Sequence, residues 1–343
     1  MKDLKHLYEF EKLLESANNA LVQQACAEGK HALAYTCYHM PEVLLNTGNC
    51  FSVRLRAPLT GSLDISSYYM SNFICDYCKS LLERGIEGGY NFLSGLMGTE
   101  TCSEMNRALE HFELLRLVDN EQFFVTFLDM PFKVTENTVR HYVDQLRRKV
   151  LTPLQEVYGV DVSDDALRKA VAEHNEVCRI LTEIGQFRKD ENPRITGYEY
   201  HILNLVSYCC PKYLIVEKLR ETLEELRQRE PDVKPRFRVK IAVVGSEIDD
   251  PGFTKLVEDA GALVVEPQYS QNRRRRSSRE SAASRPAGAR EHRAPLPQHQ
   301  SVPALHAARE GRRPLAACAR PVRGVSRAGR AVRAAQVLRI LGL

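Results

Sequence analysis

Residues 32–55, ALAYTCYHMPEVLLNTGNCFSVRL, decide the fold class of this chain. The first seven of them form a short apolar run typical of a buried strand, and residues 51–55 alternate apolar and polar positions as a second strand does. Between the two, Pro41 opens a helix of one or two turns that Gly48 closes. A strand, a short helix and a further strand in succession predict an α/β fold.

The same alternation continues along the chain. Apolar spacing predicts helices at 2–28, 66–88 and 103–117 and strands at 92–96 and 123–128. It then predicts four helices, at 139–158, 164–187, 198–210 and 214–229, followed by a strand, a helix and a strand at 237–245, 253–261 and 262–266.

We therefore predict two Rossmann-like α/β domains joined by a helical segment, the second domain being incomplete. The expected boundaries are an N-terminal α/β domain at 1–134, a helical connector at 135–236, the start of the second domain at 237–270, and a disordered Arg/Ala-rich tail at 271–343.

The net charge of +4 is an average over two unlike parts of the 343 residues. Residues 271–343 contain 17 Arg and no Lys and carry a net charge of +14, which leaves −10 on the first 270 residues. Arg, Ala, Pro and Gly supply 43 of these last 73 residues, and Phe, Tyr and Trp supply none, so the segment cannot bury a core.

Two interpretations of this tail are open. Four consecutive arginines at 273–276 are typical of an arm that binds nucleic acid. However, natural basic arms usually mix Lys with Arg, and the codons of Arg, Ala, Pro and Gly can consist of G and C alone. The composition is therefore also what a GC-rich gene yields when it is translated out of frame. We favour the second interpretation and do not expect a nucleic-acid partner.

Membrane insertion and secretion are not expected. The sequence has no apolar run near the roughly 18 residues of a membrane span, and the first 29 residues lack the pattern of a secretion signal. We predict a cytoplasmic protein, in whose reducing surroundings the ten cysteines would be thiols or metal ligands before disulfides.

Cys75, Cys78 and Cys102 are the cysteines best placed for chemistry. The Cys75-x-x-Cys78 pair falls on a predicted helix, and Cys102 follows a predicted strand, where α/β folds place their sites. Two half-buried helical cysteines would give the same pair. A zinc site would need a second close ligand pair, which Cys102-Ser-Glu104 does not offer, and a thioredoxin-like pair would begin a helix that follows a strand. Three widely spaced thiolates suit an iron–sulfur cluster with one open iron.

Residues 35–48 can be explained locally as a well-capped helix, but together with 51–55 they resemble the opening of the 2-hydroxyacyl-CoA dehydratase and benzoyl-CoA reductase family. Residues 74–80 (ICDYCKS) resemble the helix that bears its first cluster cysteine, and 101–107 (TCSEMNR) resemble its second ligand loop. Residues 193–197 and 239–246 are also similar, so the resemblance extends from about residue 30 to Glu266.

The resemblance implies that Cys75 and Cys102 are ligands of a 4Fe-4S cluster and that Cys78 is not. It also implies that Glu42, with His39 and Cys37, faces the substrate as polar or acid/base groups. The remaining cysteines of the helices and strands are expected to pack in the core or at its edge.

The implied function is that of a 2-hydroxyglutaryl-CoA dehydratase D-component type of subunit, a hydro-lyase. The subunit would form a heterodimer with a second dehydratase subunit. An ATP-hydrolysing iron–sulfur activator would deliver one electron to this subunit pair. The electron reaches the thioester of an acyl-CoA substrate, and the resulting ketyl radical expels the neighbouring hydroxyl group. A benzoyl-CoA-reductase-like subunit is the alternative, and a non-enzymatic protein with a nucleic-acid-binding tail is the alternative of another class.

One family feature is missing, namely a third ligand in a Lys-Phe-Cys motif near the C-terminus. Residues 333–343 can be written in codons that, when translated from one base later, encode Lys-Phe-Cys-Glu-Tyr. The same shift applied to residues 300–308 permits another family-like phrase, Arg-Ala-Cys-Pro. We therefore hypothesise a frameshift after about residues 266–271. Inactivity of the chain as written stays open as an alternative, because it lacks this ligand and most of its second domain.

Overall fold

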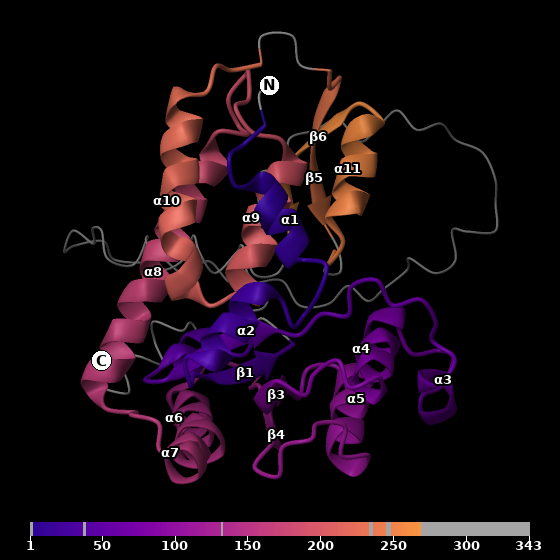
Figure 1. The fold of residues 1–343 in the computed structure, drawn as a ribbon, viewed down its shortest axis with the longest axis vertical. Coiled ribbons are helices and arrows are strands. Elements are labelled where there is room, and N and C mark those ends of the chain that lie inside the picture. Colours follow the sequence, from indigo (N-terminus) through magenta and orange to yellow (C-terminus); the bar gives the residue numbers. More distant parts are fainter. Residues whose placement is uncertain (1–2, 37–38, 132, 233–235, 245–247, 269–343) are drawn as a thin grey trace, which may run out of the picture.

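The computed structural model describes residues 3–36, 39–131, 133–232, 236–244 and 248–268, without the side chains of 244 and 266–268. The candidate residue Cys37 and the predicted tail at 271–343 lie outside the described residues. Within them, the α/β prediction is confirmed as a parallel four-stranded sheet and a second, smaller parallel sheet (Figure 1).

The larger sheet has the strand order β2-β1-β3-β4, and every neighbouring pair is parallel. Its strands are β1 (His31–Tyr35), β2 (Cys50–Arg54), β3 (Leu93–Thr99) and β4 (Phe124–Leu128). The chain adds β2 on one side of β1 and then returns to add β3 and β4 on the other side. Such a reversal of direction opens a crevice at the carboxyl ends of the two central strands, β1 and β3, where α/β proteins bind their ligands.

Both faces of this sheet are covered, as a parallel sheet requires. Alternate residues of β1 point to opposite sides, so Leu33 and Tyr35 join one core while Ala32 and Ala34 join another. The first core is completed by η1 (Glu42–Asn46), α6 (Glu136–Leu146), the π-helical turn Arg147–Leu151, α7 (Thr152–Tyr158) and the start of α8 (Asp164–Gln186). The second is completed by α2 (Ala20–Ala27), α4 (Asp76–Ile86) and α5 (Ser103–Leu114).

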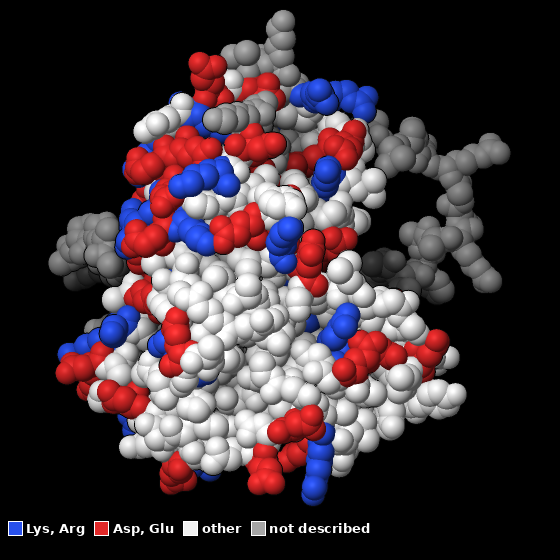
Figure 2. Space-filling view, in the orientation of Figure 1, with Lys and Arg blue, Asp and Glu red and all other residues white. Residues whose placement is uncertain are grey.

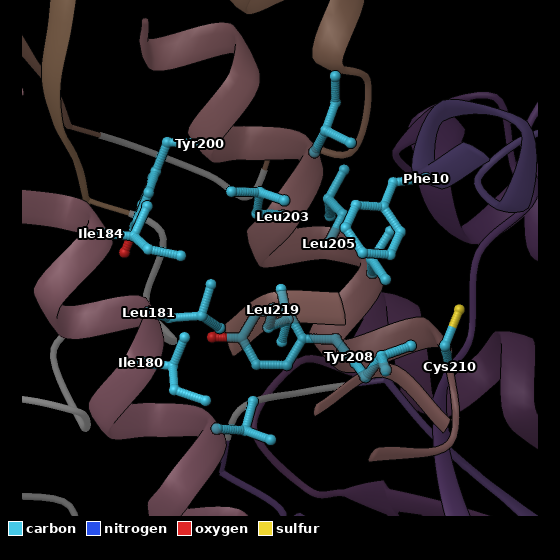
Figure 3. Packing of buried hydrophobic residues seen from close by; sticks show 14 of the residues in the cluster. Phe10, Ile180, Leu181, Ile184, Tyr200, Leu203, Leu205, Tyr208, Cys210 and Leu219 are labelled. Carbon is cyan, nitrogen blue, oxygen red and sulfur yellow. The ribbon is translucent and has the colours of Figure 1, made fainter. Parts of the chain in front are cut away.

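A third core joins segments from both ends of the sequence. Phe10 of α1 (Leu7–Leu13) belongs to one buried cluster with residues of α8, α9 (Gly197–Cys209) and α10 (Lys212–Gln228), among them Ile184, Leu203 and Leu219, all labelled in Figure 3. The smaller sheet pairs β5 (Val239–Val244) with β6 (Ala262–Gln268), and their connecting helix α11 (Pro251–Asp259) packs against α9. The first helix of the chain thus belongs to the upper half of the molecule in Figure 1, away from the larger sheet.

Two helices that were predicted to be continuous are each divided into two in the structure. The helix expected at 2–28 is divided into α1 and α2, because the Asn19 side chain accepts hydrogen bonds from Leu21 and Val22 and starts a new helix. Gly29 ends α2 with a φ of +80°, as predicted. The helix expected at 66–88 is divided into α3 (Ser66–Tyr69) and α4, since the Ser71 hydroxyl group binds the nearby backbone N–H of Phe73 in place of a helical bond.

Acidic residues on the helices of the upper half are balanced by basic ones. Glu176 of α8 binds Arg179 at 2.7 Å and Arg220 at 3.2 Å, and Lys218 of α10 pairs with Glu9 of α1. Figure 2 shows red and blue side chains interleaved over these helices, which is typical of a solvated helical surface. No helix among the described residues is long and apolar enough to span a membrane.

A nearly buried ion pair ties the larger sheet to the upper half of the molecule. Asp249, which follows β5, accepts hydrogen bonds from Arg54 Nη1 at 2.5 Å and Arg56 Nε at 2.9 Å. Arg56 also donates to the Leu14 carbonyl oxygen at 3.0 Å. Burial alone would raise the pKa of Asp249, but the two guanidinium groups outweigh it and lower this pKa. Three segments far apart in the sequence therefore meet at Arg56, which binds both the Leu14 carbonyl oxygen and the Asp249 carboxylate.

Removing that carboxylate would leave two buried arginines without their anion. We expect Asp249→Ala to lower the free energy of unfolding by about 3 kcal/mol or more, the usual effect of breaking a buried ion pair. Denaturant titration followed by circular dichroism would measure this change. Asp259→Ala, at an exposed position of the neighbouring α11, is the control, and an equal effect of the two substitutions would contradict the role assigned to Asp249.

Candidate functional site

Cys75 and Cys102 each stand immediately before a helix. Cys75 is the N-terminal cap residue of α4, with an extended backbone at φ −61° and ψ 146°, and Cys102 holds the same position at α5. Both side chains are exposed. The prediction that Cys75 lies within a helix is therefore wrong, because the break between α3 and α4 places it at a helix start. The first N–H groups of a helix lack partners within it and favour nearby negative charge.

Glu104, in the first turn of α5, connects the two helix starts. Its carboxylate accepts a hydrogen bond from the backbone N–H of Cys75 at 2.9 Å, and this bond lowers the pKa of Glu104. On the other side of α4, the hydroxyl group of Tyr77 donates to the carbonyl oxygen of Leu55 at 2.7 Å, just after the end of β2. Cys75 is thus held between the carboxyl end of β2 and the helix that follows β3.

Cys78 lies one turn into α4 and is buried, with its Sγ 3.3 Å from that of Cys75. Burial is the main reason for the raised pKa of Cys78, and the hydrogen bond to Cys75 and the electrostatic influence of Cys75, Cys102 and Glu104 add to it. The ligand atoms of Cys75, Cys78 and Glu104 all lie within 4.8 Å of one another. This set of two thiols and a carboxylate could hold a metal ion.

Sequence reasoning did not identify Glu104 or the closeness of Cys78. A zinc site was expected to need a second close ligand pair, which Cys102-Ser-Glu104 was judged not to offer, whereas the structure places the Glu104 carboxylate beside the two thiols. The available signal was the spacing Cys102-Ser-Glu104, since an acidic residue in the first turn of a helix faces the partner-free N–H groups at a helix start.

His39 belongs to the loop that follows β1, at the same carboxyl edge of the sheet. Its side chain is partly buried, and its backbone carbonyl oxygen accepts a hydrogen bond from the Tyr142 hydroxyl group of α6 at 3.0 Å. Because β1 and β3 are parallel neighbours, the loop with His39 and the loop that leads to Cys102 leave the sheet at one edge. The crevice predicted from the strand order therefore has His39 and Cys102 on its two adjoining strand ends.

Glu42 is buried beneath this edge and faces the interior. Its carboxylate accepts a hydrogen bond from the Tyr35 hydroxyl group at 2.5 Å and lies 3.4 Å from Lys212 Nζ and 3.2 Å from His174 Nδ1. Burial alone would raise the pKa of Glu42, but Lys212, His174 and Tyr35 outweigh it and hold this pKa well below its usual range. Through these contacts Glu42 connects the end of β1 to α8 and α10.

His174 continues the network to a further thiol. Its Nε2 lies 3.4 Å from the Sγ of Cys178, one turn along α8. Burial alone would lower the pKa of His174, but the electrostatic interactions and hydrogen bonds with Cys178 and Glu42 outweigh it and raise the pKa from 6.5 to about 9. The folded chain therefore keeps a proton on His174 at neutral pH.

This raised pKa makes stability depend on pH. Below pH 6.5 the folded and unfolded chains both hold the proton, whereas between pH 6.5 and about 9 only the folded chain does. The stabilising contribution is thus present below pH 6.5 and is lost as the pH rises to about 9. We expect the free energy of unfolding to fall over this range by on the order of 1–3 kcal/mol more than in His174→Gln.

Denaturant titrations at a series of pH values would measure the two slopes. His141→Gln provides the matched control, because His141 is exposed on α6 and lies 3.6 Å from the exposed Asp129. Equal slopes for the wild-type chain and His174→Gln would contradict the proton assigned to His174.

A family profile matches most of the chain. The profile described as HGD-D, 2-hydroxyglutaryl-CoA dehydratase, D-component, matches residues 37–285. The match starts near the predicted beginning of the resemblance and continues past Glu266. The frameshift hypothesis concerns residues outside the described part of the chain and stays a prediction.

Three curated relatives share this similarity at low identity. The (R)-phenyllactyl-CoA dehydratase beta subunit of Clostridium sporogenes is 22% identical over 76% of this chain and 68% of its own length. The beta subunit of (R)-2-hydroxyglutaryl-CoA dehydratase of Acidaminococcus fermentans is 22% identical over 73% of this chain and 65% of its own. A benzoyl-CoA reductase subunit of Thauera aromatica is 19% identical over 70% of this chain and 61% of its own. The chain thus matches only about two thirds of each relative's length, and it belongs to the 2-hydroxyglutaryl-CoA dehydratase D-component family.

Proposed function

We propose that this chain is a subunit of a 2-hydroxyacyl-CoA dehydratase and that Cys75 and Cys102 bind a 4Fe-4S cluster at the carboxyl edge of the larger sheet. The observation that carries the proposal is the pairing of two exposed cysteines at the starts of adjacent helices, joined by the bond between Cys75 N–H and Glu104. Family membership supports the same activity.

The residues present fit such a cluster in their chemistry. Iron–sulfur clusters are held by Cys thiolates, and both thiols are open to an incoming cluster. The starts of α4 and α5, which are 11 and 12 residues long, direct partner-free N–H groups toward the negative charge that thiolates and cluster carry together. When bound, the cluster would supply one-electron transfer at low potential to the thioester of an acyl-CoA.

The remaining groups of the edge would bind, orient or move protons. Glu104 would position Cys75 through its backbone N–H, and Tyr77 would fix the same helix start to β2. His39, on the loop after β1, would face the substrate and exchange a proton with the departing hydroxyl group, and Cys37, outside the described residues, is proposed to face the substrate with it. The contacts of Glu42 support a positioning role, in which its buried carboxylate holds the end of β1 and so the loop with His39.

The proposal includes partners. Two of the relatives are named as beta subunits and the third as one subunit of a reductase, which supports a second subunit beside this chain. An ATP-dependent iron–sulfur activator would deliver the electron, and a 2-hydroxyacyl-CoA would be the substrate. Dehydration is favoured over ring reduction because the matching family profile and two of these three relatives are dehydratases by name.

Cluster binding can be tested on the chain alone. After anaerobic incubation with ferrous iron, sulfide and a dithiol, we expect bound iron and sulfide with a brown colour, since two thiolates at helix starts retain the cluster. Cys75→Ser and Cys102→Ser should each lose most of the bound iron. Cys26→Ser, which alters a partly buried thiol on α2, should bind iron as the wild type does. Equal iron content in all four proteins would contradict the assignment.

The activity is tested with the partners present. The chain would be expressed with a second subunit and the activator of a related dehydratase and assayed anaerobically with ATP and a panel of 2-hydroxyacyl-CoAs. We expect enoyl-CoA formation that Cys75→Ser abolishes and Cys26→Ser preserves. Reduction of benzoyl-CoA without any dehydration would overturn the proposed reaction in favour of the reductase alternative. If the chain binds iron but converts none of the 2-hydroxyacyl-CoAs, while a frame-corrected version converts them, the activity requires the corrected C-terminal part.

A further inference from the structure

The Cys75-x-x-Cys78 pair has the arrangement of a dithiol that can close on itself. The two Sγ atoms lie 3.3 Å apart, and a disulfide needs about 2.05 Å. Cys75 precedes α4 with extended backbone, so its side chain can rotate without meeting a preceding helical turn, whereas Cys78 is fixed within the helix. A small rotation at Cys75 would therefore bring the sulfur atoms into bonding distance.

Exposure divides the two thiols into different roles. Cys75 is exposed and can be reached by a dissolved disulfide, whereas Cys78 is buried and shielded from it. This combination of an accessible thiol and a shielded one 3.3 Å away favours exchange within the pair over a lasting bond to an external thiol.

We propose that Cys75 and Cys78 form a reversible disulfide in the cluster-free chain and that this bond withholds Cys75 from the cluster. The first half of the proposal stands on the geometry of the pair, and the second half rests on the proposed function. The disulfide would act as a redox-controlled gate on cluster loading, because a thiol bound in a disulfide cannot ligate iron.

The chemistry balances with a low-molecular-weight disulfide as oxidant. The Cys75 sulfur attacks one sulfur of that disulfide, whose S–S bond breaks and releases one small thiol with the proton that Cys75 gave up. The Cys78 sulfur then attacks Cys75 Sγ, which releases the second small thiol with the proton of Cys78. Two electrons pass from the cysteine pair to the small disulfide, and a dithiol reductant reverses both steps.

Cys102 and Glu104 are the neighbours that could alter this outcome. Cys102 is exposed and lies close enough to Cys78 to interact with it electrostatically, so it is the competing partner for a disulfide. Glu104 holds the backbone N–H of Cys75 at 2.9 Å and keeps the start of α4 in place while the sulfur moves.

The disulfide is tested on the full chain, purified without iron and equilibrated in buffers of increasing oxidised glutathione. We expect chymotryptic cleavage after Tyr77 to yield two peptides, with Cys75 and Cys78, that remain joined until reduction and together show the mass loss of two hydrogen atoms. In Cys78→Ala, Cys75 should instead retain a glutathione adduct, and in Cys75→Ser residue Cys78 should stay unmodified. A glutathione adduct at Cys75 of the wild type, a bond between Cys75 and Cys102, or no modification at either thiol would overturn the proposal.

Cluster loading is then compared between the reduced and the oxidised chain. We expect the oxidised chain to bind no iron until a dithiol is added, whereas Cys78→Ala equilibrated without glutathione should bind iron at once. Equal iron uptake by the oxidised and reduced chains would overturn the gating role. The two proposals fail in different ways, because a reduced chain that takes no iron contradicts the proposed function while the mass loss still tests the disulfide.

Discussion

Parallel pairing of β1 with β3 is the constraint on which the candidate site depends. Because the two strands run in the same direction, the chain leaves both of them at one edge of the sheet. It returns to the opposite edge through a covering helix before the next strand begins. The helix that follows β3 consequently begins at that edge and carries Cys102 as its first cap residue. The loop after β1, with His39, leaves from the adjoining strand end. Residues that are more than 60 positions apart in the sequence become neighbours through this one choice of strand direction.

The edge is then stiffened from both sides. Below it, Glu42 joins β1 to α8 and α10 through Tyr35, His174 and Lys212, so the strand end cannot move independently of the helical half. Beside it, Asp249 holds Arg54 and Arg56 and fixes the end of β2. The thiols themselves stand on the outside of this framework, exposed and attached through backbone contacts of helix starts. A rigid edge with accessible thiols is what a cluster-binding surface requires.

Much of this architecture could be predicted from the sequence, and the failures have physical causes. Strands such as β1 and β4 and long helices such as α8 were predictable because their apolar periodicity is strong. The breaks before α2 and α4 were not, since they depend on side chains of Asn19 and Ser71 that bind the backbone locally and leave the apolar spacing intact. Placement of Cys75 inside a helix followed from missing the second break.

The site was predictable in its residues and less so in its contacts. Cys75 and Cys102 were singled out from motifs, but the contact that joins them runs through Glu104, whose position depends on how α4 and α5 pack. Glu42 was expected to face the substrate because the family resemblance implied it. Sequence spacing gave no sign of Lys212 and His174, which lie more than 100 residues further on and surround its carboxylate.

The central claim is that Cys75 and Cys102 bind the same iron–sulfur cluster. Anomalous X-ray diffraction at the iron edge, on crystals of the anaerobically reconstituted chain, tests it most directly. The account predicts one compact group of iron atoms bonded to both Sγ atoms, at the starts of α4 and α5. A single iron held by Cys75, Cys78 and Glu104 with Cys102 unbound, or iron elsewhere in the molecule, would contradict it.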